Sequence, residues 1–251
     1  MSGTSWSLIE GELTQISSGT FGIFGVNKND NIFFREGINS KNIYGNSWTC
    51  LDGGLKQISN GEYGVWGVNS YNHIFYRNNV SQDNPKGSNW TKIDGNFSHV
   101  SVGYYGIWAL DPEGQIFFRE GVSEQNPMGI GWTNIKGTLK DIAVGYFGVW
   151  GVNSNGEIFY RKNVNKLNPK GTEWIKLDGE LKNISDGYFG VWGVNSKGEI
   201  FYRKNVNTLN RQGTNWIRID GKLKNISVGD YGLWGVNDKD KIFVRENIIP
   251  D

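Results

Sequence analysis

The sequence has little cysteine, proline or histidine, and it contains no long apolar run. The single cysteine, Cys50, excludes an internal disulfide framework and is typical of a reducing compartment. No run of about 18 apolar residues predicts a membrane span, and the start, Met1 to Ser5, has neither the basic nor the apolar part of a signal peptide. We therefore expect a cytoplasmic protein without membrane insertion, and release by a route that needs no signal peptide remains open.

An excess of charge is also lacking. The 26 basic and 25 acidic residues give a net charge of +1, which offers no electrostatic footprint for nucleic acid. Glycine, in contrast, is abundant at 36 of 251 residues, about twice its usual share of roughly 7%. Abundant glycine with five prolines suits many strands joined by tight turns, and helices are hard to place.

A motif of glycine, aromatic residues and asparagine recurs along the whole chain. One copy runs from Gly145 to Asn153 and continues from Gly156 to Arg161. Its glycine at position 148 has counterparts at 42-residue intervals without insertion or deletion, namely Gly22, Gly64, Gly106, Gly190 and Gly232. Six copies account for the chain. Because one copy is too short to bury a core alone, the copies are expected to stack into a single domain.

Each copy is predicted to form four short strands. In the fourth copy these are residues 139–143, 148–153, 157–162 and 173–177, rich in β-branched and aromatic residues and bounded by turn formers. Apolar residues at consecutive positions indicate that both faces of each sheet are covered. A hairpin dipeptide, with Lys136 replacing its aspartate in one copy, is expected to lead to the next copy at Asp52-Gly53, Asp94-Gly95, Asp178-Gly179 and Asp220-Gly221.

The two ends of the chain predict a closed ring. The last copy, from Leu223 to Arg245, has three strands and stops, while Ser5 to Ile9 has the pattern of the missing fourth strand. We predict an all-β, six-bladed β-propeller whose last blade is closed by the N-terminal strand. An open β-solenoid is the rival, but it would need distinct caps. The predicted single domain spans 1–251, with blades at about 13–52, 55–94, 97–136, 139–178, 181–220, and 223–246 plus 5–10.

A propeller places two kinds of loop on one face, the turn between strands one and two and the long loop between strands three and four. That face would carry aromatic rings, guanidinium groups and amides, which suit sugars because C–H faces pack on rings while polar groups orient the hydroxyls. The candidate ligand-binding residues are Tyr104, Tyr146 and Tyr188, Arg77, Arg119, Arg161 and Arg203, Asn79, Asn163 and Asn205, and Trp90, Trp132, Trp174 and Trp216.

Structural roles compete for several of these positions. The fourth-strand tryptophans could either pack within the blade or form the wall of a binding site. The arginine that occurs in every copy could equally well contact a ligand or brace the long loop through a hydrogen bond. The tyrosine position is Thr20, Glu62 or Asp230 in the other copies, which favours exposure. The long loop is either a simple turn or a binding loop. Second-strand tryptophans are predicted to be core, namely Trp66, Trp108, Trp150, Trp192 and Trp234.

Catalysis has little support in the sequence. His73 and His99 occur once each, at unrelated places in the repeat, so neither a metal cluster nor a Ser-His-Asp set can be assembled. Turn chemistry explains the repeated aspartates without catalytic carboxylates, and Cys50 has no basic neighbour in sequence to activate it. We expect no catalytic residue, no metal and no cofactor.

The copies of Leu-Lys-x-Ile-Ser-x-Gly-x-x-Gly-x-Trp-Gly-Val-Asn, then Ile-Phe-Tyr-Arg and Trp-x-x-Ile-Asp-Gly, resemble tectonin repeats over essentially all of the chain. Such repeats occur in slime-mould and mushroom tectonins, fish-egg lectins and horseshoe-crab plasma lectins. The resemblance implies a six-bladed propeller lectin with glycan sites between neighbouring blades, serving defence or recognition. It implies ligands such as O-methylated sugars, N-acetylglucosamine or lipopolysaccharide. The third copy departs from the pattern at Ala109 to Pro112.

Two hypotheses follow. The first is a multivalent lectin whose partners are mono- or oligosaccharide ends of cell-surface glycans; repeated sites on one face would give avidity even in a monomer, and the oligomeric state is open. The second is a non-catalytic protein-interaction scaffold. A hydrolase with a site in the central channel ranks last, because convergent carboxylates are not found.

Overall fold

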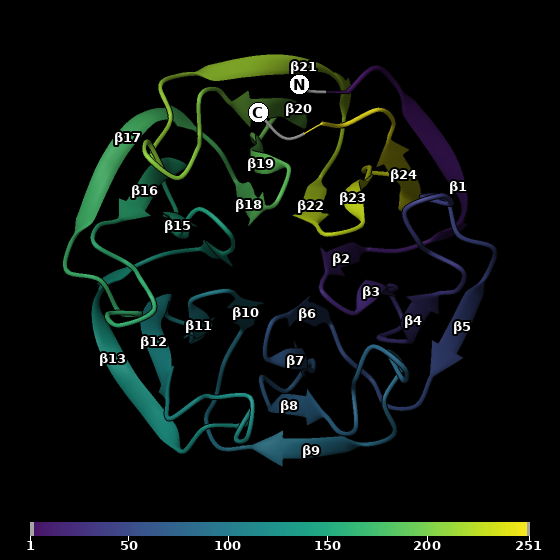
Figure 1. Cartoon of the computed structure of the whole chain (residues 1–251), viewed down its shortest axis with the longest axis horizontal. Coiled ribbons are helices and arrows are strands. Elements are labelled where there is room, and N and C mark those ends of the chain that lie inside the picture. The colour runs from purple at the N-terminus through teal and green to yellow at the C-terminus, as the bar shows by residue number, and fades with distance from the viewer. Residues whose placement is uncertain (1–2, 250–251) are drawn as a thin grey trace.

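The computed structural model describes residues 3–249, in which six antiparallel four-stranded sheets surround a central axis (Figure 1). Blade 1 is β2 (Gln15–Gly19), β3 (Gly22–Val26), β4 (Ile32–Arg35) and β5 (Trp48–Leu51); blade 2 is β6 (Gln57–Gly61), β7 (Gly64–Val68), β8 (Ile74–Arg77) and β9 (Trp90–Ile93); blade 3 is β10 (His99–Gly103), β11 (Gly106–Leu110), β12 (Gln115–Glu120) and β13 (Gly131–Thr138).

The second half of the ring follows the same plan. Blade 4 is β14 (Asp141–Val144), β15 (Val149–Val152), β16 (Glu157–Arg161) and β17 (Trp174–Glu180); blade 5 is β18 (Asn183–Gly187), β19 (Gly190–Val194), β20 (Glu199–Arg203) and β21 (Trp216–Lys222); blade 6 is β22 (Asn225–Gly229), β23 (Gly232–Val236), β24 (Lys241–Arg245) and β1 (Trp6–Glu12). The predicted six-bladed propeller is therefore confirmed, with its first strand innermost in each blade (Figure 1).

The ring is closed by the N-terminal strand, as the sequence predicts. β1 pairs antiparallel with β24, with Trp6 opposite Arg245 and Ile9 opposite Ile242. The Thr4 amide also donates to the Glu246 carbonyl at 3.0 Å. Blade 6 is thus built from both ends of the chain, and β24 has no unpaired edge at the closing seam.

Second-strand tryptophans fill the blade core, which confirms their predicted role. Trp66, Trp108, Trp150, Trp192 and Trp234 have no exposed surface. Each lies opposite a third-strand residue, and Trp66 packs edge to face on Tyr76 with the ring centroids 5.4 Å apart. Such pairs add to the free energy of burial beyond their area alone.

Neighbouring blades approach most closely where their first strands end. A Cβ added to the last glycine of β10, Gly103, would lie 1.9 Å from the Val144 carbonyl oxygen of the next blade, and a Cβ on Gly61 would lie 2.3 Å from that of Val102. No side chain fits such a gap, so glycine is required here for packing. The repeated glycine before the first turn therefore sets the spacing of the blades.

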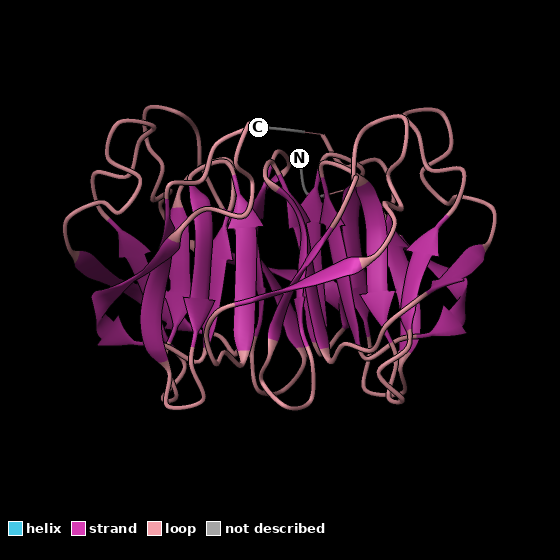
Figure 2. Ribbon diagram, turned by 90° about the horizontal axis from the view of Figure 1, so that it is seen from below, coloured by secondary structure: helices cyan, strands magenta, loops and turns pink. Residues whose placement is uncertain are grey.

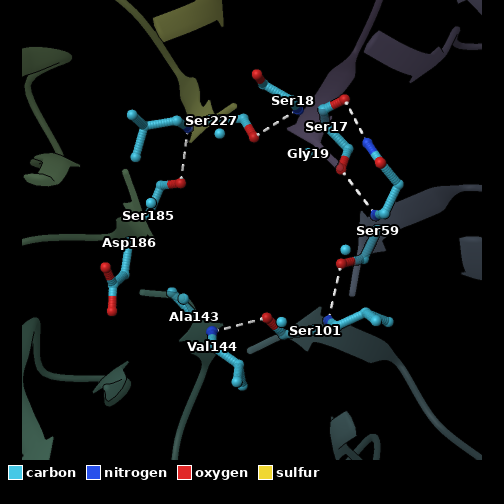
Figure 3. A pocket seen from close by; sticks show the side chains of 18 of the residues that line it. Ser17, Ser18, Gly19, Ser59, Ser101, Ala143, Val144, Ser185, Asp186 and Ser227 are labelled. Atoms are coloured by element: carbon cyan, nitrogen blue, oxygen red, sulfur yellow. Dashed lines mark hydrogen bonds between the residues drawn. The ribbon is translucent and has the colours of Figure 1, made fainter. Parts of the chain in front are cut away.

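The central channel is bordered by one ring of hydroxyl groups (Figure 3). Ser59 Oγ accepts from the Val102 amide at 3.0 Å, and Ser101 Oγ accepts from the Val144 amide at 2.9 Å. Ser17, Ser185 and Ser227 make the same bond to the next blade. Ala143 stands at the sixth position and interrupts the ring. These bonds join successive blades around the axis.

Two of the predicted turns are wrong, because Asp178-Gly179 and Asp220-Gly221 lie inside the fourth strands β17 and β21 at register shifts. Asp178-Gly179 is not a hairpin turn but a β-bulge, because Ile158 pairs with Leu177 whereas Glu157 pairs with Glu180. The glycine adopts a φ of 92°, which satisfies the bulge as well as it would satisfy a turn. The observed bounds of the fourth blade differ from the predicted strands by up to three residues. Among residues 3–249 no helix is long and apolar enough to cross a membrane.

The two faces of the disk differ in loop length, as expected. Long loops stand on one face and short turns on the other (Figure 2). The long loop of blade 2 reaches back over the first turn of blade 1, where Gln82 Nε2 donates to the Thr20 carbonyl at 3.3 Å. Loops of one blade can therefore complete a site on the preceding blade.

Candidate functional site

A pocket of about 230 Å³ lies on the long-loop face between blades 3 and 4. Its floor and walls come from the first turn of blade 3, with Tyr104 and Tyr105, and from Phe118 on β12. Tyr63 of blade 2 closes one side, and the long loop of blade 4 contributes Lys166 and Pro169. The pocket therefore combines residues from three blades, and Tyr104 is the one predicted ligand-binding residue in its lining.

Lys166 converts this pocket from a purely aromatic one into a mixed one. Its Nζ lies 4.2 Å from the Tyr104 ring centroid, within cation–π range. A hydrogen bond with the Tyr104 hydroxyl raises the pKa of Lys166, so the ammonium is charged at neutral pH. On the opposite wall, the Glu120 carboxylate accepts from Lys170 Nζ at 2.7 Å. A ring, a cation and a carboxylate thus face one small space.

The three predicted tyrosines form one arc beside this pocket. The ring centroids of Tyr104 and Tyr146 lie 6.1 Å apart, and those of Tyr146 and Tyr188 lie 5.9 Å apart. Tyr146 is 42% and Tyr188 49% exposed, which confirms the predicted exposure for these two, whereas Tyr104 is half-buried. All three also line the rim of the central channel, whose volume is about 460 Å³. The arc joins pocket and channel.

The predicted arginines and fourth-strand tryptophans form a repeated unit at the outer edge of each junction. In blade 5, the buried Arg203 donates from Nε to the Gln212 carbonyl at 2.9 Å and lies 5.3 Å from the Trp216 ring centroid. Its Nη1 donates to Asp178 of the preceding blade at 2.6 Å. Trp216 Nε1 donates to the Asp178 carbonyl at 3.0 Å. One aspartate therefore satisfies both side chains.

The same unit recurs around the ring. Arg77 with Trp90 and Asp52, and Arg119 with Trp132 and Asp94, repeat every contact. These arginines are 3–4% exposed, so both the guanidinium and the indole are engaged by the protein itself. The repeated aspartates, for which the sequence predicts a turn, act as ion-pair partners. Arg161 with Trp174 is the exception, because Lys136 takes the place of the aspartate.

The predicted asparagines occupy a backbone position with special geometry. Asn79, Asn163 and Asn205 have φ values of 57°, 59° and 58°, and glycine takes the same place in Gly37 and Gly121. Asparagine is the non-glycine residue best suited to this left-handed conformation. Their amides brace the loop, as in the 3.1 Å bond from Asn163 Nδ2 to Thr172 Oγ1. The long loop is consequently preformed.

Two buried carboxylates border the channel. Asp186 accepts from the Phe147 amide at 3.1 Å, yet complete burial raises the pKa of its carboxyl well above the usual value. Burial likewise raises the pKa of Asp141, which the 3.6 Å contact with His99 Nε2 partly offsets. Both groups bond to backbone of a neighbouring blade, so they belong to the inter-blade hydrogen bonds.

Within residues 3–249 no group of three or more histidine, cysteine, aspartate or glutamate side chains could hold a metal ion. Cys50 is exposed on β5. His99 faces the channel and His73 lies next to a short turn on the opposite face. Polar and aromatic side chains therefore come together in the pocket and in the tyrosine arc. Such a combination suits binding of a small molecule or a surface group.

Fold and site together define a repeat propeller with long, preformed loops on one face. The tectonin domain model matches residues 1–139, 129–220 and 186–251, and the chain belongs to the tectonin domain family. No curated protein matches the chain.

Solved structures resemble the chain in fold alone. Human WBSCR16 is 16% identical with a TM-score of 0.55, covering 94% of this chain and 73% of that one. YCF48 bound to D1 peptide is 12% identical with a TM-score of 0.54, covering 97% and 94%. Yeast RCC1 (Prp20), with Kap60 bound, is 12% identical with a TM-score of 0.53, covering 92% and 67%.

Proposed function

We propose that this protein is a non-catalytic lectin that binds sugar ends of surface glycans in the pocket between blades 3 and 4. The observation that carries the proposal is the Tyr104–Lys166 pair in the pocket lining, which brings an aromatic ring and a charged donor to one small space. A sugar ring packs its C–H face on an aromatic ring and gives its hydroxyls to charged and amide groups. The volume of about 230 Å³ lies below the range of drug-sized ligands, which starts near 300 Å³, and suits a single ring.

Two of the other predicted residues extend this site. Tyr146 and Tyr188 continue the aromatic surface from Tyr104 toward the following blades, so a second sugar residue would meet Tyr146. Repeated sites on one rigid face would give avidity of about 10²–10⁴ on a dense surface. O-methylated sugars, N-acetylglucosamine and lipopolysaccharide are the first ligands to test, and recognition or defence is the matching role.

The test is a glycan array probed with labelled protein, followed by agglutination of cells that display the best ligands. Tyr104→Ala should weaken binding about fivefold or more, since one lost aromatic stack accounts for about 1 kcal/mol or more. Tyr71→Ala is the matched control, because Tyr71 is 76% exposed in a short turn of the opposite face. Equal loss in both variants, or no signal for any glycan in either assay, contradicts the proposal.

A protein-interaction scaffold is the second candidate, and the long-loop tips favour it. Leu167 and Leu209 occupy equivalent tips of blades 4 and 5 and are 99% and 98% exposed. Two almost fully exposed leucines on the loops of adjacent blades offer an apolar contact to a partner. The structurally similar YCF48 binds the D1 peptide. A pull-down that retains a stable partner without glycan, and loses it in Leu167→Ser/Leu209→Ser, would favour this function over sugar binding.

A further inference from the structure

The outer edge of the blade 3–4 junction lacks a carboxylate that every other junction possesses. At the other five junctions the strand-three arginine pairs with an acidic side chain at 2.5–2.8 Å, through Glu10, Asp52, Asp94, Asp178 or Asp220. The equivalent residue at this junction is Lys136, which is exposed. A positively charged residue, Lys136, therefore occupies the sequence position that supplies the acidic partner of the arginine elsewhere.

Arg161 is nevertheless buried like the other arginines. It is 7% exposed, its Nε donates to the Lys170 carbonyl at 2.8 Å, and its Cζ lies 5.3 Å from the Trp174 ring centroid. Among residues 3–249 its terminal nitrogens have no hydrogen-bonded or ion-paired acceptor. Burial lowers the pKa of Arg161, and Glu173 acts in the opposite direction. The group stays protonated, since arginine side chains are effectively always charged in proteins.

A second donor is left without a partner beside it. Trp174 Nε1 is buried and makes no hydrogen bond within the described part of the chain, whereas the other fourth-strand indoles donate to a carbonyl at 2.8–3.0 Å. The buried indole N–H without an acceptor is costly for the fold, and the Arg161 guanidinium beside it lacks the neutralising carboxylate of the other junctions. The other indoles donate to main-chain carbonyls and the other arginines to side-chain carboxylates. A ligand in the carboxylate position would therefore neutralise Arg161 and lie close to the Trp174 indole, which favours an anionic group.

The acceptor that Arg161 lacks can be supplied by a dissolved ligand, because the equivalent carboxylates at the other junctions face solvent. Asp52, Asp94 and Asp178 side chains are 57%, 64% and 57% exposed while bonded to arginines that are 3–5% exposed. The equivalent acceptor position beside the buried Arg161 therefore faces solvent. Glu173, the acid that acts on the pKa of Arg161, is 63% exposed and pairs with Lys162 at 3.2 Å.

We infer that the blade 3–4 junction binds a carboxylate-bearing ligand, whose oxygens accept from the Arg161 guanidinium in the place that an aspartate side chain fills elsewhere. Lys136 adds a second cation at the rim. A planar carboxylate matches the fork of a guanidinium better than a spherical anion does. The acid of a uronic sugar and an isolated carboxylate share this chemistry. The inference does not depend on sugar binding at Tyr104.

The test uses the indole N–H resonance of Trp174 in ¹⁵N-labelled full-length protein, assigned with Trp174→Phe. Glucuronate, acetate and glucose are titrated separately at constant ionic strength, with sodium chloride as the balance. We expect a saturable shift with glucuronate and acetate and none with glucose. Tighter binding of glucuronate identifies an acidic sugar as the source, while equal binding identifies the carboxylate alone. A shift that chloride reproduces, or no saturable shift, overturns the inference.

Two variants make the test specific. Lys136→Asp restores the acid of the other junctions and should reduce affinity at least about tenfold, because the internal carboxylate occupies Arg161. Lys197→Asp is the control with the same charge change, in an exposed turn of blade 5. Asp178→Ala should create a second site, reported by the Trp216 indole. Equal affinity of Lys136→Asp and the wild type contradicts the inference even if a carboxylate binds.

Discussion

Arg203 Nη1 and Asp178 Oδ1 lie 2.6 Å apart and belong to different blades. The arginine side chain is 3% exposed and the aspartate 57%, so the pair sits half in solvent. Asp178→Ala should lower the free energy of unfolding by about 1–2 kcal/mol, less than for a fully buried pair. Lys136→Asp should raise it by about 1 kcal/mol, since it gives Arg161 a partner. Urea unfolding measures both, and changes of the same sign would contradict a stabilising role for the pair.

The glycines at the ends of the first strands give a second prediction. Gly103→Ala should lower the free energy of unfolding by about 3 kcal/mol or more, because the new Cβ would meet the Val144 carbonyl oxygen at 1.9 Å. Gly131→Ala is the control, since nothing lies within 4 Å of its added Cβ and its φ is not positive. Similar urea midpoints for the two variants would show that blade spacing tolerates a side chain.

Closure of the ring gives a third prediction. Deletion of Met1 to Glu10 removes most of β1 and uncovers Ile242, which is fully buried opposite Ile9. We expect the melting temperature to fall by about 10 °C or more, the equivalent of several kcal/mol. A point variant separates packing from chain length: Ile9→Ser should destabilise, while Leu8→Ser, at a position 64% exposed, should not. An unchanged melting temperature after deletion would count against closure.

Asp186 predicts a pH dependence. Burial raises the pKa of its carboxyl in the folded state, so the folded protein binds that proton more tightly than the unfolded chain. The associated stability is present below about pH 4 and is lost as the pH rises through the folded pKa. Asp186→Asn removes this loss, and Asn60 already fills the equivalent position with hydrogen bonds to the Ser17 and Gly22 carbonyls.

At pH 7 the Asp186→Asn variant should therefore be more stable than the wild type by about 1–2 kcal/mol. The difference should shrink as the pH falls toward 4. Guanidinium chloride unfolding at several pH values is the measurement. If the wild type is the more stable protein at neutral pH, the amides of the first turn together with Arg211 hold the carboxylate charged, and the expected direction of the pKa shift is wrong.

The sequence predicts the fold well because the repeat period can be recognised without knowing which residues are in contact. The 42-residue spacing and the split last copy are enough to place β1 beside β24. The Asp-Gly dipeptides mislead because a bulge and a hairpin turn need the same glycine conformation. The arginine–aspartate pairs escape prediction for another reason: Asp178 and Arg203 are 25 residues apart and lie in different copies.

The sequence predicts the candidate site only in part. Tyr104, Tyr146 and Tyr188 can be found because their position varies between copies while its neighbours do not. Lys166 cannot, because it lies 62 residues from Tyr104 and reaches it only when blade 4 folds its loop over blade 3. The serine ring does leave a signal, a serine at the third place of every first strand except Ala143, but its meaning depends on the distance between blades.

The pairing of Trp6 with Arg245 also fixes an order of events in time. During synthesis β1 leaves the ribosome well before β24, because all the strands of blades 1 to 5 lie between them in the chain. Until β24 has been made, the nascent chain can complete blades 1 to 5 from adjacent sequence, while β1 waits without a sheet. Of the strand pairings among residues 3–249, this one spans the longest stretch of chain, so the ring can be sealed only after the strands of the other five blades have been made.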